Sequence, residues 1–235
     1  MDKVLITGAS RGLGYELVKI FHQEGNEVFP TVRTSQSAEI LKAEFKERIY
    51  PIIADISLDQ SELIIRNELT KLTDRLDILI NNAGNSGKGN EIQAVSTDEV
   101  QQVFNVHCLG VIRTIKAAES FLEKSLFPRV INVSSRLGSL QMTANQEFTH
   151  LGTSYSYRIA KAAQNMLTIC LDQEYRRKGI SVHAIHPGKL KSNQASSDAD
   201  MEVSMGAYNI YQWLSQMKKG SSGEFIQPGV GHLNW

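Results

Sequence analysis

Six short, largely apolar runs, separated by longer amphipathic stretches, most constrain how this chain can fold. The runs span residues 4–6, 27–32, 49–54, 76–80, 130–133 and 180–185. Helical patterns lie between them, at about 12–24, 36–47, 59–72, 97–124 and 157–178. Strands that are apolar without alternation are buried on both faces, which is typical of a parallel sheet covered by helices.

The order of these elements predicts the fold class. A further helical pattern near 204–219 and a short last strand around Phe225 follow the sixth run. With right-handed crossovers, this is an α/β fold: a single Rossmann-type doubly wound parallel sheet of about seven strands, with helices on both faces. Residues 1–235 are expected to form one domain, in which the polar region at about 189–205 is a substrate loop.

The composition argues against several kinds of partner. Lys plus Arg and Asp plus Glu number 25 each, which gives no support for a nucleic-acid partner or an anionic membrane surface. No apolar run approaches the ~18 residues of a membrane span, and the first strand begins near Lys3, leaving no room for a signal peptide. Cys108 and Cys170 lie in apolar helical runs and are expected to be reduced, packed thiols. We therefore expect a cytoplasmic protein.

A glycine-rich turn follows the first strand and opens the first helix. It reads Thr7-Gly8-Ala9-Ser10-Arg11-Gly12-Leu13-Gly14. Glycines permit a tight turn and let the backbone approach a pyrophosphate, which the positive end of the helix stabilises. Such a turn can also be only a tight connection, but its strand–turn–helix context predicts a dinucleotide site.

The charges near this turn favour NADP(H) as the cofactor. An NAD site usually carries an acidic residue about 20 positions after the turn, whereas this chain has Arg33 at the end of its second strand. Arg33 and Arg11 together would pair with a 2′-phosphate. The alternative is that both arginines are solvated surface charges.

Tyr157 and Lys161 lie four residues apart, so a helix stacks them on one face. A nearby ammonium favours phenolate, and we expect Lys161 to lower the pKa of Tyr157 and make it a usable proton donor. Tyr155 has Ile159 at the same spacing and is not expected to act. A tyrosine and a lysine also occur at this spacing by chance, so the pair supports a catalytic role only together with other motifs in the chain.

Taken together, these motifs resemble the short-chain dehydrogenase/reductase family over essentially the whole chain. The resemblance rests on Thr7, Gly8, Gly12 and Gly14 in the turn, on Asn81-Asn82-Ala83-Gly84, and on Pro187-Gly188 after the sixth strand. It implies cofactor contacts from residues in six segments: Gly8, Ser10, Arg11, Gly12, Leu13 and Gly14; Arg33; Asp55 and Ile56; Asn82, Ala83 and Gly84; Tyr157 and Lys161; Pro187, Gly188, Leu190 and Ser192. Gly223-Glu224-Phe225-Ile226 and Trp235 further resemble sniffer-type carbonyl reductases and C-factor-like proteins.

The resemblance also implies a catalytic tetrad of Asn105, Ser135, Tyr157 and Lys161. Tyr157 would donate a proton to the developing alkoxide, while Ser135 would position the carbonyl oxygen. Lys161 would bind the nicotinamide ribose, and Asn105 would hold a water that links Lys161 to solvent. The implied function is an NADP(H)-dependent oxidoreductase that transfers hydride between nicotinamide and a carbonyl or alcohol.

Two departures from the family pattern stand out. Ser135 and Tyr157 are 22 positions apart, longer than the usual dozen or so, and the extra residues at about 141–154 are expected to form a loop beside the site. Lys189 stands where the family often has an apolar residue; it could favour an anionic substrate or point outward.

Several alternatives remain open at this stage. The histidines show no ligand spacing, so no metal site is expected. His186 is expected to pack near the cofactor without catalysing anything. Relatives form monomers and dimers, which leaves a homodimer as the favoured but unsettled state. An NADP-binding signalling protein is the alternative function, against which the complete tetrad argues.

Overall fold

A computed structural model describes residues 1–191 and 198–235, within which eight strands form one sheet in the order β3-β2-β1-β4-β5-β6-β7-β8. All neighbouring strands are parallel except β7 and β8. The strands are β1 Lys3–Ile6, β2 Glu27–Val32, β3 Ile52–Ile53, β4 Ile78–Asn81, β5 Arg129–Val133, β6 Ser181–Ile185, β7 Phe225–Gln227 and β8 Gly231–His232. The strand order reverses between β1 and β4, which is where ligands bind in doubly wound sheets.

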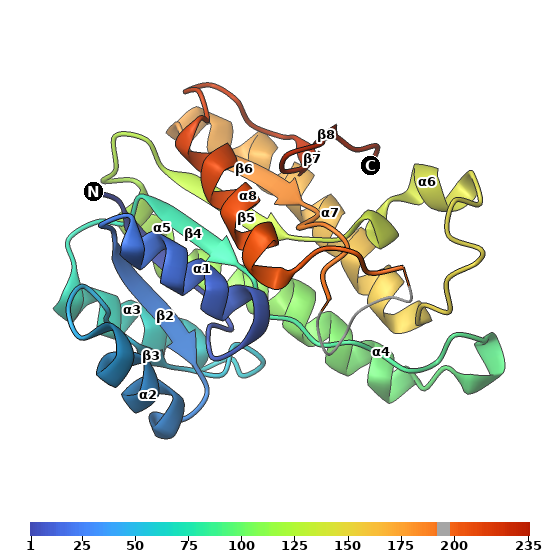
Figure 1. Ribbon diagram of the computed structural model, residues 1–235, viewed down its shortest axis with the longest axis horizontal. Helices are drawn as coiled ribbons and strands as arrows, with labels where there is room; N and C mark the ends of the chain where they lie inside the picture. Colours follow the sequence, from blue (N-terminus) through green and yellow to red (C-terminus); the bar gives the residue numbers. More distant parts are fainter. Residues whose placement is uncertain (192–197) are drawn as a thin grey trace.

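Helices cover both faces of this sheet (Figure 1). The α-helices are α1 Gly12–Gln23, α2 Ser35–Phe45, α3 Ser61–Leu72, α4 Thr97–Phe104, α5 Gly110–Leu122, α6 Leu140–Ala144, α7 Tyr155–Tyr175 and α8 Val203–Ser215. One hydrophobic core packs α1 and α8 against the sheet, and the other packs α3, α5 and α7 against the opposite face. The strands are nearly free of exposed apolar surface because both of their faces are covered.

Most expected elements are present, and four of the expectations need correction. The sheet has an eighth strand, β8, which is antiparallel. The third strand is only Ile52–Ile53, although Ile49 makes a separate bridge with Val28. The helix expected over 97–124 is divided by a π-helical turn, η2, at Asn105–Leu109. Cys108 is buried as expected, but Cys170 is exposed, because the outward face of α7 carries it.

No helix within residues 1–191 and 198–235 combines the length and the apolar character that crossing a bilayer requires.

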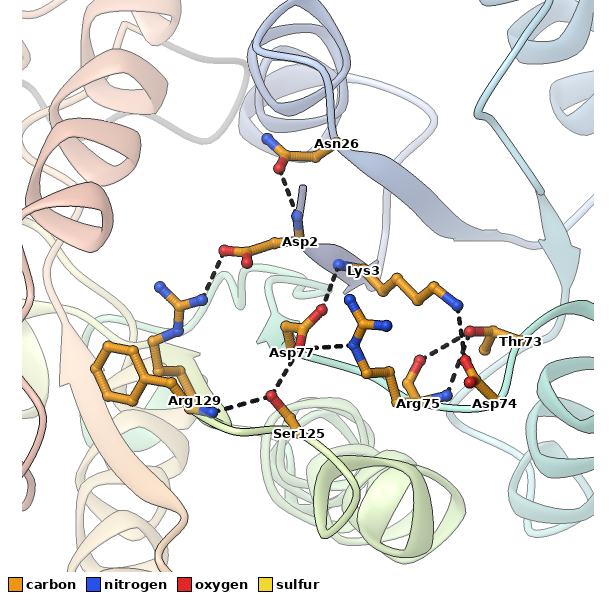
Figure 2. A network of polar contacts seen from close by, with 10 residues as sticks. Asp2, Lys3, Asn26, Thr73, Asp74, Arg75, Asp77, Ser125 and Arg129 are labelled. Carbon is orange, nitrogen blue, oxygen red and sulfur yellow. Dashed lines mark hydrogen bonds and ion pairs between the residues drawn. The ribbon is translucent and has the colours of Figure 1, made fainter.

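A polar network holds the amino-terminal edge of the sheet together (Figure 2). Asp77 is buried just before β4 and accepts hydrogen bonds from the Lys3 backbone N–H at 2.9 Å, Arg75 Nε at 3.2 Å and Ser125 Oγ at 2.6 Å. Arg129 of β5 pairs with Asp2 at 2.6 Å. These contacts join the starts of β1, β4 and β5, so they fix the strand register from which the opposite edge is built.

We expect Asp77→Ala to lower the free energy of unfolding by about 2–3 kcal/mol, because it leaves a buried backbone donor and Ser125 unpaired. For a chain of this size this corresponds to roughly 4–12 °C in Tm, measurable by calorimetry. Asp74→Ala is the matched control, since the Asp74 side chain also binds Lys3 but is 79% exposed, and its Tm should barely change. Equal effects of the two substitutions would show that the Asp77 network adds no stability.

Candidate active site

The glycine turn is locked against the end of β4. A side chain on Gly8, which has φ +67°, would place its Cβ 2.7 Å from Ala83 Cα, and one on Gly14 would approach Gly8 O to 2.3 Å. By contrast, a Cβ on Gly12, which has φ +58°, meets no atom within 4 Å. The turn is therefore closed toward the protein and open in front of the α1 N-terminus. The Arg11 side chain does not cap that end of the helix, which leaves backbone N–H groups available for an anion.

Asn82 supports this turn. Its Nδ2 donates to Thr7 O at 2.9 Å and Gly8 O at 3.2 Å, while its backbone N–H and that of Ala83 donate to Thr7 Oγ1, both at 3.0 Å. Its side-chain donors are thus engaged by the protein. Asn81 lies one residue earlier and bonds Asn132 of β5 at 2.9 Å, which joins two neighbouring strand ends.

Two exposed arginines flank the open side of the turn. Ala9 N donates to Thr31 O at 3.1 Å, so the end of β2, with Arg33 just beyond it, lies beside the turn that carries Arg11. Within residues 1–191 and 198–235, neither Arg11 nor Arg33 has an ion-pair partner. Two unpaired guanidiniums beside a helix N-terminus suit a phosphate-bearing ligand.

The remaining expected cofactor residues line the same edge of the sheet to different degrees. Asp55 uses Oδ1 to accept from Ser57 N at 3.0 Å and Ser57 Oγ at 2.7 Å, and Ile56 is buried against Gly110. After β6, Pro187, Gly188 and Leu190 line a cavity to which Ser135 and Tyr157 also contribute. Ser192 lies outside the described residues.

Ser135, Tyr157 and Lys161 come together at the ends of β5 and α7. Ser154 caps α7 by accepting from Tyr157 N at 3.4 Å, which starts the helix two residues earlier than expected and sets its rotation. Lys161 Nζ lies 5.6 Å from the centre of the Tyr157 ring, and Ser135 and Tyr157 line the same cavity. Tyr155 points to the surface, with 42% of its area exposed.

Burial controls the protonation of this pair. Desolvation lowers the pKa of Lys161 to about 7, although its Nζ donates to Val133 O at 2.6 Å and Gln164 Oε1 at 3.0 Å. Desolvation also raises the pKa of Tyr157, against a smaller lowering by the bond to Ser135. The direction is opposite to the one expected from the sequence, because loss of hydration on burial has the largest effect on the pKa of this phenol.

Asn105 is not brought together with the other three residues. Its Nδ2 donates to Ser57 O at 2.8 Å, and its Oδ1 accepts from Arg113 Nη1 at 2.8 Å. The amide therefore ties the end of α4 to the loop after β3. The continuous helix expected from the sequence hid this, because the π-helical turn widens the backbone after Asn105 and changes which side chains face α7.

His107, two residues further on, does face the site. It is 2% exposed, and its ring meets the Tyr157 ring edge to face, with centres 5.6 Å apart and an interplanar angle of 88°. Sequence reasoning weighed this histidine only as a metal ligand. A polar side chain within the otherwise apolar run at residues 106–111 was the signal that it needed a partner.

A cavity of about 340 Å³ opens in front of Ser135 and Tyr157. Its walls are polar, with Ser86, Ser154, His186, Arg136 and Lys189 among them. The last two are paired with acidic residues, Arg136 with Asp198 and Lys189 with Asp200, the latter at 2.6 Å. Lys189 thus faces the cavity, contrary to the outward orientation, but its charge is balanced.

The long insert between Ser135 and Tyr157 forms one wall of the cavity and contains the short helix α6, where a loop was expected. Phe148 and Leu151 are buried with Leu137 in a small core, and Tyr157 packs against it. Trp235 O accepts from Gln141 N at 3.1 Å, and its ring stacks on Phe225. In Figure 1 the insert extends beyond the carboxyl ends of the strands.

The sheet order and the glycine turn define a doubly wound nucleotide-binding fold. The model of the family described as short chain dehydrogenase matches residues 2–203, so the chain belongs to this family. The C-signal protein of Myxococcus xanthus is 30% identical over 163 residues, which cover 69% of this chain and 95% of that protein.

Two solved carbonyl reductases have the same fold over the full length of this chain. The NADPH-bound carbonyl reductase from chicken fatty liver superposes with a TM-score of 0.89 at 27% identity, covering 100% of this chain and 99% of that one. Carbonyl reductase Sniffer of D. melanogaster gives a TM-score of 0.87 at 26% identity, with 100% of both chains covered. These structures agree with the resemblance inferred from the sequence.

We expect acid to destabilise the protein through its buried histidines. Burial lowers the pKa of His107 and of His186 to about 3, well below the unfolded value near 6.5. Between about pH 6.5 and 3 the unfolded chain therefore binds protons that the folded chain does not. Each histidine then costs about 1.4 kcal/mol of stability per pH unit as pH falls through this window, and nothing above it. Urea unfolding at pH 7, 6 and 5 measures the slope.

His186→Asn should remove one histidine's share of this slope. Substituting His150, which is exposed, should leave this slope unchanged. An unchanged slope in His186→Asn would contradict the buried, uncharged state of this ring.

Proposed function

We propose that the protein is an NADP(H)-dependent oxidoreductase of the carbonyl reductase type, acting on small aldehydes or ketones. The observation that carries this proposal is that Ser135 and Tyr157 line one cavity at the carboxyl edge of the sheet, with Lys161 buried beside Tyr157. NADPH, when bound, supplies the hydride for carbonyl reduction. The likeness to an NADPH-bound carbonyl reductase supports the choice of cofactor and of reaction.

The raised pKa of Tyr157 suits it to the reductive direction. A phenol that stays protonated at neutral pH is the form that donates a proton to a developing alkoxide. Ser135 and Tyr157 line the same cavity, so both would act on the carbonyl oxygen of a substrate bound there. Lys161, with a pKa near 7, exchanges protons readily at the working pH and would restore the proton to Tyr157.

NADP(H) fits the opening described above. The α1 N-terminus and the open space at Gly12 would take the pyrophosphate, and the unpaired Arg11 and Arg33 would take the 2′-phosphate. An acidic residue that would select a ribose 2′-hydroxyl is absent from the end of β2.

A signalling role is not proposed for this chain. The similarity to C-signal covers 69% of the sequence and does not by itself transfer a role. A protein that only binds the cofactor does not need a tyrosine in the wall of a cavity with a lysine beside it, as Tyr157 and Lys161 are arranged here.

Tyr157→Phe should lower kcat/KM for NADPH-dependent reduction of 4-nitrobenzaldehyde by at least ~100-fold, because the proton donor is lost. The Kd for NADPH, measured by fluorescence titration, should stay within about twofold. Tyr155→Phe, an exposed tyrosine on the same helix, should leave both values unchanged. Undiminished turnover by Tyr157→Phe would rule out this mechanism.

Arg33→Ala should raise the Kd for NADPH about 10- to 100-fold, because a charge-assisted bond to the 2′-phosphate contributes about 1.5–3 kcal/mol. The Kd for NADH should not change, since NADH lacks this phosphate. Arg177→Ala, an exposed arginine after α7, is the control and should affect neither. A parallel loss of NADPH and NADH affinity would place Arg33 outside the 2′-phosphate site.

A further inference from the structure

His107 lies where three parts of the site meet. It occupies the middle of the π-helical turn η2, between α4 and α5. The neighbouring Cys108 Sγ contacts Ala160 O on α7 at 3.4 Å, immediately before Lys161. The turn is therefore packed directly on the helix that carries Tyr157 and Lys161.

The Nε2 atom of His107 anchors this turn to the end of β4. It lies 2.8 Å from Asn85 O, and Asn85 N lies 3.3 Å from the same nitrogen. Nε2 can donate to the carbonyl or accept from the N–H, but it cannot do both at once. The shorter distance favours the tautomer with hydrogen on Nε2, which donates to Asn85 O. Nδ1 is then an unprotonated nitrogen, and it is buried without a hydrogen-bond partner.

The ring is fixed on its other sides as well. A Cβ on Gly84 would lie 2.5 Å from His107 Cε1, so only glycine at this position leaves room for the imidazole. Tyr157 is held both by the edge-to-face contact with His107 and by packing on the small core of the insert. Burial, together with the charge of Lys161, lowers the pKa of His107 and keeps the ring neutral.

We propose that His107 is a positioning residue for the Tyr157–Lys161 pair: its neutral imidazole, anchored through Nε2 to Asn85, holds the π-helical turn and the Tyr157 ring in place. The proposal rests on the proposed function. It deepens that function by assigning a residue that acts through Tyr157 and does not exchange protons with the substrate.

Substitutions of His107 separate the effect of its hydrogen bond to Asn85 from the effect of its ring contact with Tyr157. His107→Phe keeps an aromatic ring against Tyr157 but cannot bond Asn85, and its kcat should fall at least ~10-fold while the Kd for NADPH stays within about twofold. His107→Asn has an amide that satisfies both the carbonyl and the N–H of Asn85. It should restore kcat to within about threefold of the wild type. Loss of activity in both variants, or in neither, would overturn the anchoring role.

His183 provides the matched control. It is also buried, but its ring meets Trp213, edge to face at 5.3 Å, whereas the His107 ring meets Tyr157. His183→Phe should change Tm without changing kcat. An equal loss of kcat in His183→Phe and His107→Phe would mean that both histidines serve only stability.

An NMR measurement tests His107 without relying on turnover. In protein labelled with ¹⁵N-histidine, the His107 signals are those missing from His107→Asn. They should show the Nε2–H tautomer and no titration between pH 8 and 5. A ring that titrates near pH 6.5, or that carries hydrogen on Nδ1, would refute the anchor. Absence of carbonyl turnover in the wild-type protein would instead refute the proposed function, and the NMR result would still decide the state of His107.

Discussion

The buried amine of Lys161 is the constraint on which the site depends. A lysine with 3% exposure has lost most of its hydration, and its position is set by the two oxygens that replace water, Val133 O and Gln164 Oε1. The first of these belongs to the end of β5, so the sheet itself fixes the amine. Because Lys161 is fixed, α7 can take only one position along the sheet and one rotation about its own axis. The same position and rotation determine where the Tyr157 hydroxyl lies. The alignment of strand ends, secured from the far edge by Asp77, is thereby transmitted to the reactive groups.

The fold was predictable from the sequence because apolar runs and helical periods are local signals. The positions of the strands along the chain, the glycine turn and the Tyr157–Lys161 spacing all depend on residues that are close in the sequence. Asn105 and His107 show where such reasoning ends. A π-helical turn adds one residue without any pattern that marks it, so the faces of α4 and α5 cannot be assigned by a single helical period. The pKa of Tyr157 was also beyond reach, since it depends on the depth of burial and not on the nearest charge.

The insert before α7 contains a small hydrophobic core that supports the wall of the cavity. Phe148 and Leu151 form a core apart from those that flank the sheet, and this core touches Tyr157. The wall of the cavity is consequently not a loose loop, although its sequence is mostly polar. Its composition can vary while the reactive tyrosine keeps an apolar surface behind it. The polar, charge-balanced lining fits small carbonyl compounds that carry polar groups, in line with the proposed reaction.

The widened turn at Asn105–Leu109 has a consequence for how this chain can change over time. Removing one residue there would restore an ordinary helical turn, because the widened turn accommodates one residue more than an α-helical turn does. The helices α4 and α5 would keep their rotation, so Gly110 would stay against Ile56. The side chains within the turn, His107 among them, would point in other directions, and a deletion in this segment would therefore change the contact with Tyr157 without disturbing the helices on either side. Among related sequences, we expect the length of this segment to be kept more strictly than its composition.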